Sequence, residues 1–201
     1  LGIMISNLAN DMYAKDASLK SSGTMKIRME SGEYCGGDAP YGYKRSTDEK
    51  GNPTTVPDAL TAPYVVKIFE KLLAGQSYLG ISREYNEMLL TPPRLYARTG
   101  KLFLNCLQEA ETHWCASTIK RIAENRHYLG NTYTHKTRTS LLTSEKNTIL
   151  DKSEWNMHEN THAALISEEV FEKVQEIIQV KQKNAVPKKD LSQVVTHGKQ
   201  D

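Results

Sequence analysis

The sequence is poor in cysteine and lacks the spacings that make cysteine structural. Only Cys35, Cys106 and Cys115 occur in 201 residues. Their odd number and the absence of a Cys-x-x-Cys pair argue against a disulfide framework and against a zinc ribbon within these residues. A chain of this length has room for a real hydrophobic core, and we expect such a core to hold the fold.

Long apolar runs are also missing. No stretch approaches the length needed to cross a bilayer, and no basic segment followed by an apolar one opens the chain. The first residue is not methionine, and the pattern that begins there is helical. We therefore interpret the chain as part of a longer, cytoplasmic protein without a membrane partner.

Signatures of catalysis are scarce. The sequence has no Gly-x-Ser-x-Gly elbow and no cysteine in a recognised nucleophile signature. The glycines at 32, 36 and 37 do not form a phosphate loop, because no Gly-Lys-Ser/Thr follows them. We expect no catalytic residue and no cofactor.

One motif is an exception, because His158-Glu159-Asn160-Thr161-His162 matches His-Glu-x-x-His. On a helix the two histidines would lie on one face and bind zinc, with Glu159 as general base. Asn160 and Thr161 are poor helix formers, however, and nothing singles out a third ligand. A zinc metallohydrolase therefore stays as an alternative function.

Net charge is only +2, so the total charge does not indicate a nucleic-acid partner and the distribution matters more. Between Glu111 and Ser140, two acidic residues face a larger set of bases: Lys120, Arg121, Arg126, Lys136 and Arg138. This segment is a local basic zone of the kind that binds polyanions.

The stretch from Trp114 to Gly130 lies inside that zone and predicts a short helix. Ser117 can accept hydrogen bonds from free amide groups and is expected to cap it. Apolar residues then recur at helical spacing, at Ile119, Ile122 and Ala123. The other faces carry Thr118, Lys120, Arg121 and Arg126. A helix with an apolar back and a basic front suits the major groove of DNA; a packed surface helix with solvated charges is the alternative.

Residues 1–29 predict a long helix that turns polar and basic in its second half, through Lys15, Lys20, Lys26 and Arg28. Such a helix either forms a coiled coil with another chain or lies along an anionic partner; a frayed terminal helix is the third possibility. Glycines from Gly32 onward and Pro40 then mark a domain boundary.

Beyond the boundary, residues 41–45 and 54–56 predict a hairpin. Two helices follow. One is capped by Thr61 and ended by Gly75, and the other is opened by Ser77 and stopped by a pair of prolines.

Residues 94–112 show no strong pattern and are expected to form an insertion loop. Residues 131–136 and 154–164 are expected to pair as strands, and Ser167 caps a final helix. The expected fold class is mainly α with small antiparallel β elements (α+β). Three short helices, the last one basic, resemble a helix-turn-helix module with an unusually long connection.

Several ordered phrases carry a family resemblance. They are Gly32-Glu33-Tyr34 with Ala39-Pro40-Tyr41-Gly42-Tyr43, Gly75-Gln76-Ser77 after a helix from Val65 to Leu73, Trp114 with Ser117-Thr118-Ile119, Asn125-Arg126-His127-Tyr128-Leu129-Gly130, and His162-Ala163-Ala164-Leu165-Ile166-Ser167-Glu168-Glu169-Val170-Phe171. In this order and spacing, from Asn10 to Gln182, they resemble the recombinase domain of the large serine recombinases, which include phage-type integrases and mobile-element transposases.

The resemblance implies a domain organisation. Residues 1–30 would be the linker helix that ends a catalytic domain, residues 31–185 the recombinase DNA-binding domain, and residues 186–201 a polar tail leading to a zinc ribbon. The catalytic serine and arginine cluster of the family would lie outside this chain. His162 falls at the histidine of the family's His-Glu-Ala-Leu phrase, where its role is structural.

The resemblance also implies a function, the recognition of one half of a double-stranded DNA attachment site during integration or excision of a mobile element. The full-length parent would be a homo-oligomer, a dimer on one site and a tetramer when two sites are paired. The residues expected to contact DNA are Lys20, Lys26, Arg28, Thr118, Lys120, Arg121, Arg126, Lys136 and Arg138.

Overall fold

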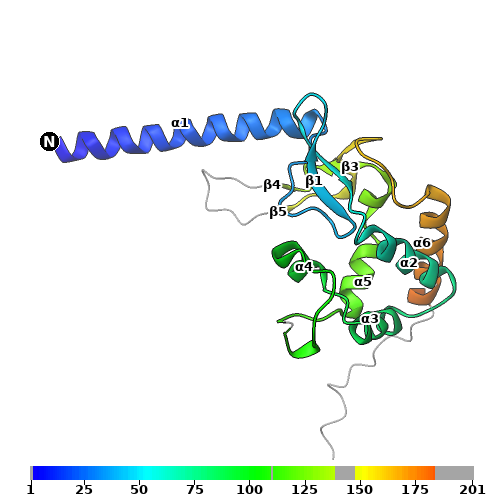
Figure 1. Ribbon diagram of the computed structural model, residues 1–201. Coiled ribbons are helices and arrows are strands. Elements are labelled where there is room, and N and C mark those ends of the chain that lie inside the picture. Colours follow the sequence, from blue (N-terminus) through cyan, green and yellow to red (C-terminus); the bar gives the residue numbers. More distant parts are fainter. Residues whose placement is uncertain (1, 110, 139–147, 184–201) are drawn as a thin grey trace, which may run out of the picture.

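A single long helix, α1 (Gly2–Glu30), projects from the body of the protein (Figure 1). The structure is a computed structural model that describes residues 2–109, 111–138 and 148–183. Between residues 10 and 27 every side chain of α1 except Ser18 is exposed. The helix predicted for residues 1–29 is therefore confirmed. These exposed side chains are not part of the core.

The carboxyl end of α1 is attached to the body by a few close contacts. Gly32 ends the helix with a φ of +79°, which favours glycine, and a Cβ there would lie 3.0 Å from the His158 ring. The Thr134 hydroxyl donates a hydrogen bond of 3.1 Å to the carbonyl of Met29. The direction of the whole helix therefore depends on a short segment of backbone.

Strands β1 (Tyr43–Thr47) and β2 (Pro53–Pro57) form the predicted antiparallel hairpin. Its turn is closed by Asp48, whose carboxylate accepts hydrogen bonds from the backbone amides of Lys50 (2.9 Å) and Asn52 (2.7 Å). An aspartate that bonds backbone two residues ahead is a common turn device, so the local sequence determines this element.

Four helices enclose the core: α2 (Ala62–Leu73), α3 (Tyr78–Glu87), α5 (Ala116–Ala123) and α6 (Glu168–Lys183). Helix α2 packs against α6, and α3 packs against α5 (Figure 1). Their apolar faces meet through side chains that are almost fully buried, among them Val65, Ile68, Phe69, Ile81, Tyr85, Ile119, Phe171 and Val174. The apolar residues whose helical spacing predicted these helices are the ones that form the core.

Of the predicted caps at Ser77 and Thr61, the structure confirms the first and not the second. Ser77 accepts a hydrogen bond from the Gly80 amide at 3.0 Å, as expected. Thr61 precedes α2 but does not cap it, because its hydroxyl donates to the Asp58 carboxylate at 2.7 Å. A hydrogen bond to a charged carboxylate is stronger than one to a neutral group, so the Thr61 hydroxyl is turned toward Asp58 and not toward the amides of the helix.

The prediction that Ser117 caps the basic helix was wrong. Helix α5 begins at Ala116, with Cys115 in the cap position. The physical reason is a tertiary contact: the Asn86 amide side chain pairs with both backbone groups of Trp114, each at 2.9 Å. This pair fixes the chain where the helix starts and overrides the capping preference of Ser117.

Residues 94–112 are not an unstructured insertion loop. Helix α4 (Pro93–Thr99) and the 3₁₀ turn η1 (Leu107–Glu109) occupy part of this segment, and an isolated bridge joins Leu90 to Phe103. Proline in the first turn and Gly100 after the last one, at a φ of +68°, are ordinary signals of a helix's two ends. The seven-residue helix is too short to show a clear apolar period, so the prediction missed it.

The predicted pairing of residues 131–136 with 154–164 is confirmed. Strand β3 (Thr132–Thr134) pairs with β6 (Asn156–His158), and we name this pair the ribbon. Two further short strands, β4 (Thr137–Arg138) and β5 (Thr148–Ile149), also pair.

Among the described residues the sheets are three, each two-stranded and antiparallel, beside a larger share of helix, which confirms the α+β class. The turns η2 (Arg126–Leu129) and η3 (Lys152–Glu154) complete the elements. The predicted polar tail lies outside the described residues. No helix in the described ranges is both long and apolar enough to cross a membrane.

Tyr128 joins the hairpin to the helices. It is 1% exposed, its hydroxyl donates a bond of 2.8 Å to the Tyr41 carbonyl, and its ring stacks on that of Tyr43 with centroids 5.9 Å apart. The Tyr43 hydroxyl in turn donates to the carbonyl of Ala163 at 2.8 Å. The hydrogen bonds of these buried phenols offset the cost of removing their hydroxyls from water, so the rings stabilise the core.

Beside these tyrosines, His127 and His162 stack with ring centroids 3.9 Å apart. His162 Nε2 lies 2.8 Å from the His127 carbonyl; because a carbonyl only accepts, this nitrogen carries the proton. Burial lowers the pKa of His127 to about 3, and the nearby His162 and Lys136 contribute to the shift. Burial also lowers the pKa of His162, against the effect of its carbonyl bond.

The stability of the fold should therefore fall as the pH drops below the usual histidine range. The unfolded chain takes up a proton at His127 below about pH 6.5, whereas the folded chain does so only near pH 3. Stability is thus fully present above pH 6.5 and is lost between these two values. We expect the free energy of unfolding to be about 2 kcal/mol lower at pH 5 than at pH 7 through this residue alone. Urea titrations at the two pH values measure the difference.

The control is His113→Gln, which changes an exposed histidine and should keep the pH difference. His127→Gln should reduce it. An equal pH difference in all three proteins would contradict the role assigned to His127.

Candidate nucleic-acid interface

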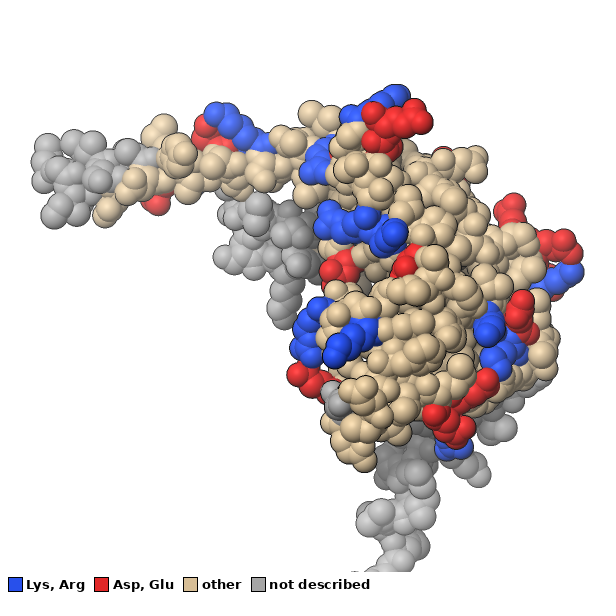
Figure 2. Space-filling model, in the orientation of Figure 1, with Lys and Arg blue, Asp and Glu red and all other residues tan. Residues whose placement is uncertain are grey.

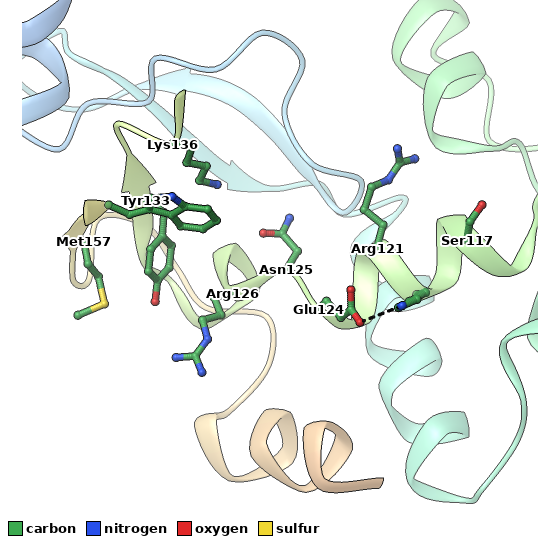
Figure 3. A pocket seen from close by; sticks show the side chains of 10 residues that line it. Ser117, Arg121, Glu124, Asn125, Arg126, Tyr133, Lys136 and Met157 are labelled. Atoms are coloured by element: carbon green, nitrogen blue, oxygen red, sulfur yellow. Dashed lines mark ion pairs between the residues drawn. The ribbon is translucent and has the colours of Figure 1, made fainter. Parts of the chain in front are cut away.

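A groove of about 940 Å³ runs between α5 and the ribbon (Figure 3). We name it the basic groove. Its lining residues are Ser117, Lys120, Arg121, Glu124, Asn125, Arg126, Tyr133, Lys136, Trp155 and Met157.

Helix α5 forms one wall of the basic groove. Because its apolar residues face the core, Lys120 and Arg121 are left exposed. Lys120 pairs with Glu124 at 3.7 Å, four residues ahead on the helix. Within the described part of the chain Arg121 has no ion-pair partner, and Figure 3 shows it on the same side of α5 as Ser117. This wall therefore presents a guanidinium free to bind an anion.

Arg126 stands where α5 gives way to the turn η2. Its guanidinium lies 3.6 Å from the Glu172 carboxylate and 5.9 Å from the centroid of the Phe171 ring, both on α6. The preceding Asn125 begins the turn, because its side-chain oxygen accepts a bond of 3.1 Å from the His127 amide. These contacts hold the end of the groove in place and leave Arg126 exposed.

The ribbon forms the opposite wall. Tyr133 lies opposite Met157 in the strand register, and both point outward because Thr132 and Thr134 on either side are buried. Figure 3 shows Tyr133, Met157 and Lys136 grouped on this side of the groove.

Lys136 lies over the aromatic rings of this wall. Its ammonium is 5.2 Å from the Trp155 ring centroid and 5.9 Å from that of Tyr133, distances typical of cation–π contacts. Although the residue as a whole remains exposed, partial burial lowers the pKa of its ammonium.

Four of the residues predicted to contact DNA come together in the basic groove: Lys120, Arg121, Arg126 and Lys136. Two others do not line it. Thr118 is half-buried, with its hydroxyl 3.1 Å from Cys115 Sγ, and Arg138 lies in β4. The structure therefore supports a common surface for four of these six residues.

The three bases predicted on α1 also lie outside the groove, and each has an acidic partner close by in the sequence. The pairs are Lys20 with Asp16 (2.7 Å), Lys26 with Glu30 (3.8 Å) and Arg28 with Glu33 (2.7 Å). Figure 2 likewise shows Lys and Arg in separate clusters interspersed with Asp and Glu, so charge on this face is mixed.

Sequence reasoning missed the ribbon side of the groove. Tyr133 had a signal, since it alternates with two threonines in a predicted strand. Trp155 and Met157 lie in the segment 154–164 that was predicted to pair with 131–136, but the sequence does not give the register that brings them beside Tyr133.

Cys115, next to the groove, is an exposed thiol at the start of α5. Hydrogen bonds from the hydroxyls of Ser117 and Thr118, each 3.1 Å from the sulfur, lower its pKa to about 7. Part of the thiol is therefore ionised at neutral pH, and the thiolate is the form that reacts with alkylating reagents.

The His-Glu-x-x-His segment does not form a helical zinc site. His158 ends strand β6, Asn160 adopts a left-handed φ of +54°, and His162 stacks on His127. Across the described ranges, no group of three or more His, Cys, Asp or Glu side chains is arranged to hold a metal ion. The geometry therefore disfavours the zinc hydrolase.

Comparisons with known proteins identify the family. Residues 60–181, well over half of the chain, match the sequence model of the family described as Recombinase. No curated protein matches the chain. A solved structure described as "Crystal Structure of a LSR-DNA Complex" is similar, with 15% sequence identity and a TM-score of 0.48, over 82% of this chain and 39% of that chain. The chain thus spans about two fifths of the length of that relative. It belongs to the Recombinase family, in agreement with its resemblance to the recombinase domain of the large serine recombinases.

Proposed function

We propose that this chain is the DNA-binding part of a site-specific serine recombinase and that duplex DNA lies in its basic groove. The observation that carries the proposal is the convergence of four cations from α5, η2 and the ribbon side on one groove. The family match and the DNA-complex relative support the same partner. The groove would recognise one half of an attachment site.

The cations of the groove are available to phosphate. Arg121 has no carboxylate partner in the described ranges, and the pairs of Lys120 with Glu124 and of Arg126 with Glu172 are long and exposed. Exposed pairs of this kind contribute at most about 1 kcal/mol. A phosphate can therefore replace the carboxylates, and the counterions released from DNA add to the binding free energy.

The proposal extends to α1. Its second half would cross the duplex and bring Lys20, Lys26 and Arg28 to the backbone or the minor groove. The first two are exposed and would exchange their carboxylate partners for phosphate. Arg28 is less free, because its side chain is 37% exposed and lies 2.7 Å from Glu33.

The remaining features of the proposed function rest on the family. The parent protein would cut both duplexes through a phosphoserine link, exchange the strands and rejoin them. It would act in the cytoplasm as a dimer on each site and a tetramer on two paired sites.

A second candidate function is self-association through α1. The helix exposes apolar side chains over much of its length, including Met12 (65%), Tyr13 (78%), Leu19 (60%) and Ile27 (68%). A coiled coil would cover them. This candidate predicts association that is insensitive to salt and no affinity for DNA, the opposite of the first proposal.

The first test is a selection of the chain against a random duplex library at two salt concentrations. We expect one enriched motif and an affinity that falls steeply as salt rises, because the cations displace counterions. Enrichment of no motif would place the sequence specificity elsewhere in the parent. No binding at low salt would overturn the proposed function.

Arg121→Ala tests the α5 wall on the selected duplex. We expect a loss of about 1–3 kcal/mol and relaxed preference at one base pair if the guanidinium reads a base edge. Uniform weakening with a shallower salt dependence would make it a phosphate contact. The control is Lys67→Ala, which removes one exposed positive charge that does not line the groove. Equal binding by the Arg121 variant and the unchanged protein would exclude this residue from the interface.

Alkylation of Cys115 tests where the DNA lies. The ionised thiol should react readily with iodoacetamide at pH 7, and the selected duplex should slow the reaction, because Ser117 two residues away lines the groove. Cys106 is exposed and outside the groove, so its labelling is the internal control. Mass spectrometry of both peptides gives the two rates. Unchanged labelling of Cys115 on saturating DNA would show that the duplex binds elsewhere.

A further inference from the structure

The basic groove has one charged wall and one largely apolar wall, on which Lys136 is the cation that lines the groove. The α5 side presents Lys120 and Arg121, whereas the ribbon side presents Tyr133, Trp155 and Met157. We name these three residues the ribbon wall. Binding of phosphate alone requires no apolar surface, and Met157 is 50% exposed. The ribbon wall is therefore available to an apolar group of the ligand.

The ribbon wall is held rigidly. Tyr133 and Met157 are paired in the strand register, and the Tyr133 and Trp155 rings meet edge to face with centroids 6.4 Å apart. The Trp155 indole N–H donates a bond of 3.1 Å to the Leu150 carbonyl, which fixes the ring. An apolar surface ordered before binding loses little conformational entropy when a ligand covers it.

The spacing of charge and apolar surface fits the edge of a duplex. Phosphates flank the major groove, and the only apolar group that the base pairs present there is the C5-methyl of thymine. Cations on α5 would meet the phosphates while the opposite wall meets the bases. Contacts with deoxyribose would be apolar too, but they would not distinguish one base from another.

We propose that the ribbon wall, with Met157 at its most exposed point, contacts thymine methyl groups and so determines part of the sequence specificity. This inference rests on the proposed function, because it requires duplex DNA in the basic groove. It assigns a reading role to the apolar side chains of the ribbon side, in addition to any base contact that Arg121 makes from the α5 side.

Deoxyuridine substitution tests the inference on the unchanged protein, because deoxyuridine differs from thymidine only by the missing methyl group. Each thymine of the selected duplex is replaced in turn, and the dissociation constant is measured by fluorescence anisotropy. At one or two positions we expect affinity to fall about fourfold, the effect of exposing one buried methyl group.

Variants of Met157 test whether this residue causes the loss of affinity for deoxyuridine duplexes. Met157→Gln should bind the thymine and deoxyuridine duplexes equally well, and Met157→Leu, which keeps the apolar surface, should preserve the difference. Met88→Gln is the matched control, because Met88 is 41% exposed, lies directly after α3 and does not line the groove. It should behave as the unchanged protein.

The outcomes separate the inference from the proposed function. Tight duplex binding without any methyl-sensitive position would overturn the role of the ribbon wall and leave the proposed function in place. Methyl sensitivity that persists in Met157→Gln would likewise overturn it. Failure to bind any duplex would instead overturn the proposed function.

Discussion

The stacked imidazoles of His127 and His162, together with the tyrosines around them, are the contact on which the rest of the structure depends. They join the hairpin, the turn η2 and the segment before α6, three parts of the chain that have no continuous sheet between them. The His127 ring is buried, the His162 ring is half-buried, and both are hydrogen-bonded, so they fix the direction of the backbone on either side of η2. That direction carries the chain from α5 into the ribbon and so sets the two walls of the basic groove facing each other.

The groove is consequently a product of tertiary structure rather than of a motif. Its cations come from α5, from η2 and from Lys136 after β3, whereas its apolar side chains come from the paired strands β3 and β6 and from Trp155 just before β6. Affinity and selectivity would then reside on different elements. Such a division lets substitutions on the ribbon change the preferred sequence while the cations of α5 and η2 keep the general attraction for DNA.

The sequence predicted most of the helices, the hairpin and the ribbon, because their apolar spacings and turn residues are local. It also predicted DNA contacts for four residues that line one groove in the structure: Lys120, Arg121, Arg126 and Lys136. It misplaced the start of α5, because the bond between Asn86 and Trp114 decides it from a distance. It did not identify Trp155, because the predicted pairing of residues 131–136 with 154–164 leaves the register open and the fold decides that this ring lies beside Lys136.

The length of α1 has a geometric consequence. A helix of 29 residues measures about 43 Å at 1.5 Å per residue, which exceeds one turn of B-DNA. In the part of the chain that the structure describes, its last turn and the residues around Gly32 join it to the body. A tilt of about 10° there would move its far end by roughly 7 Å, or about two base-pair steps. A few contacts at the base of α1 thus set the direction of the whole helix, and in the proposed complex small changes in them would shift its far end along the duplex.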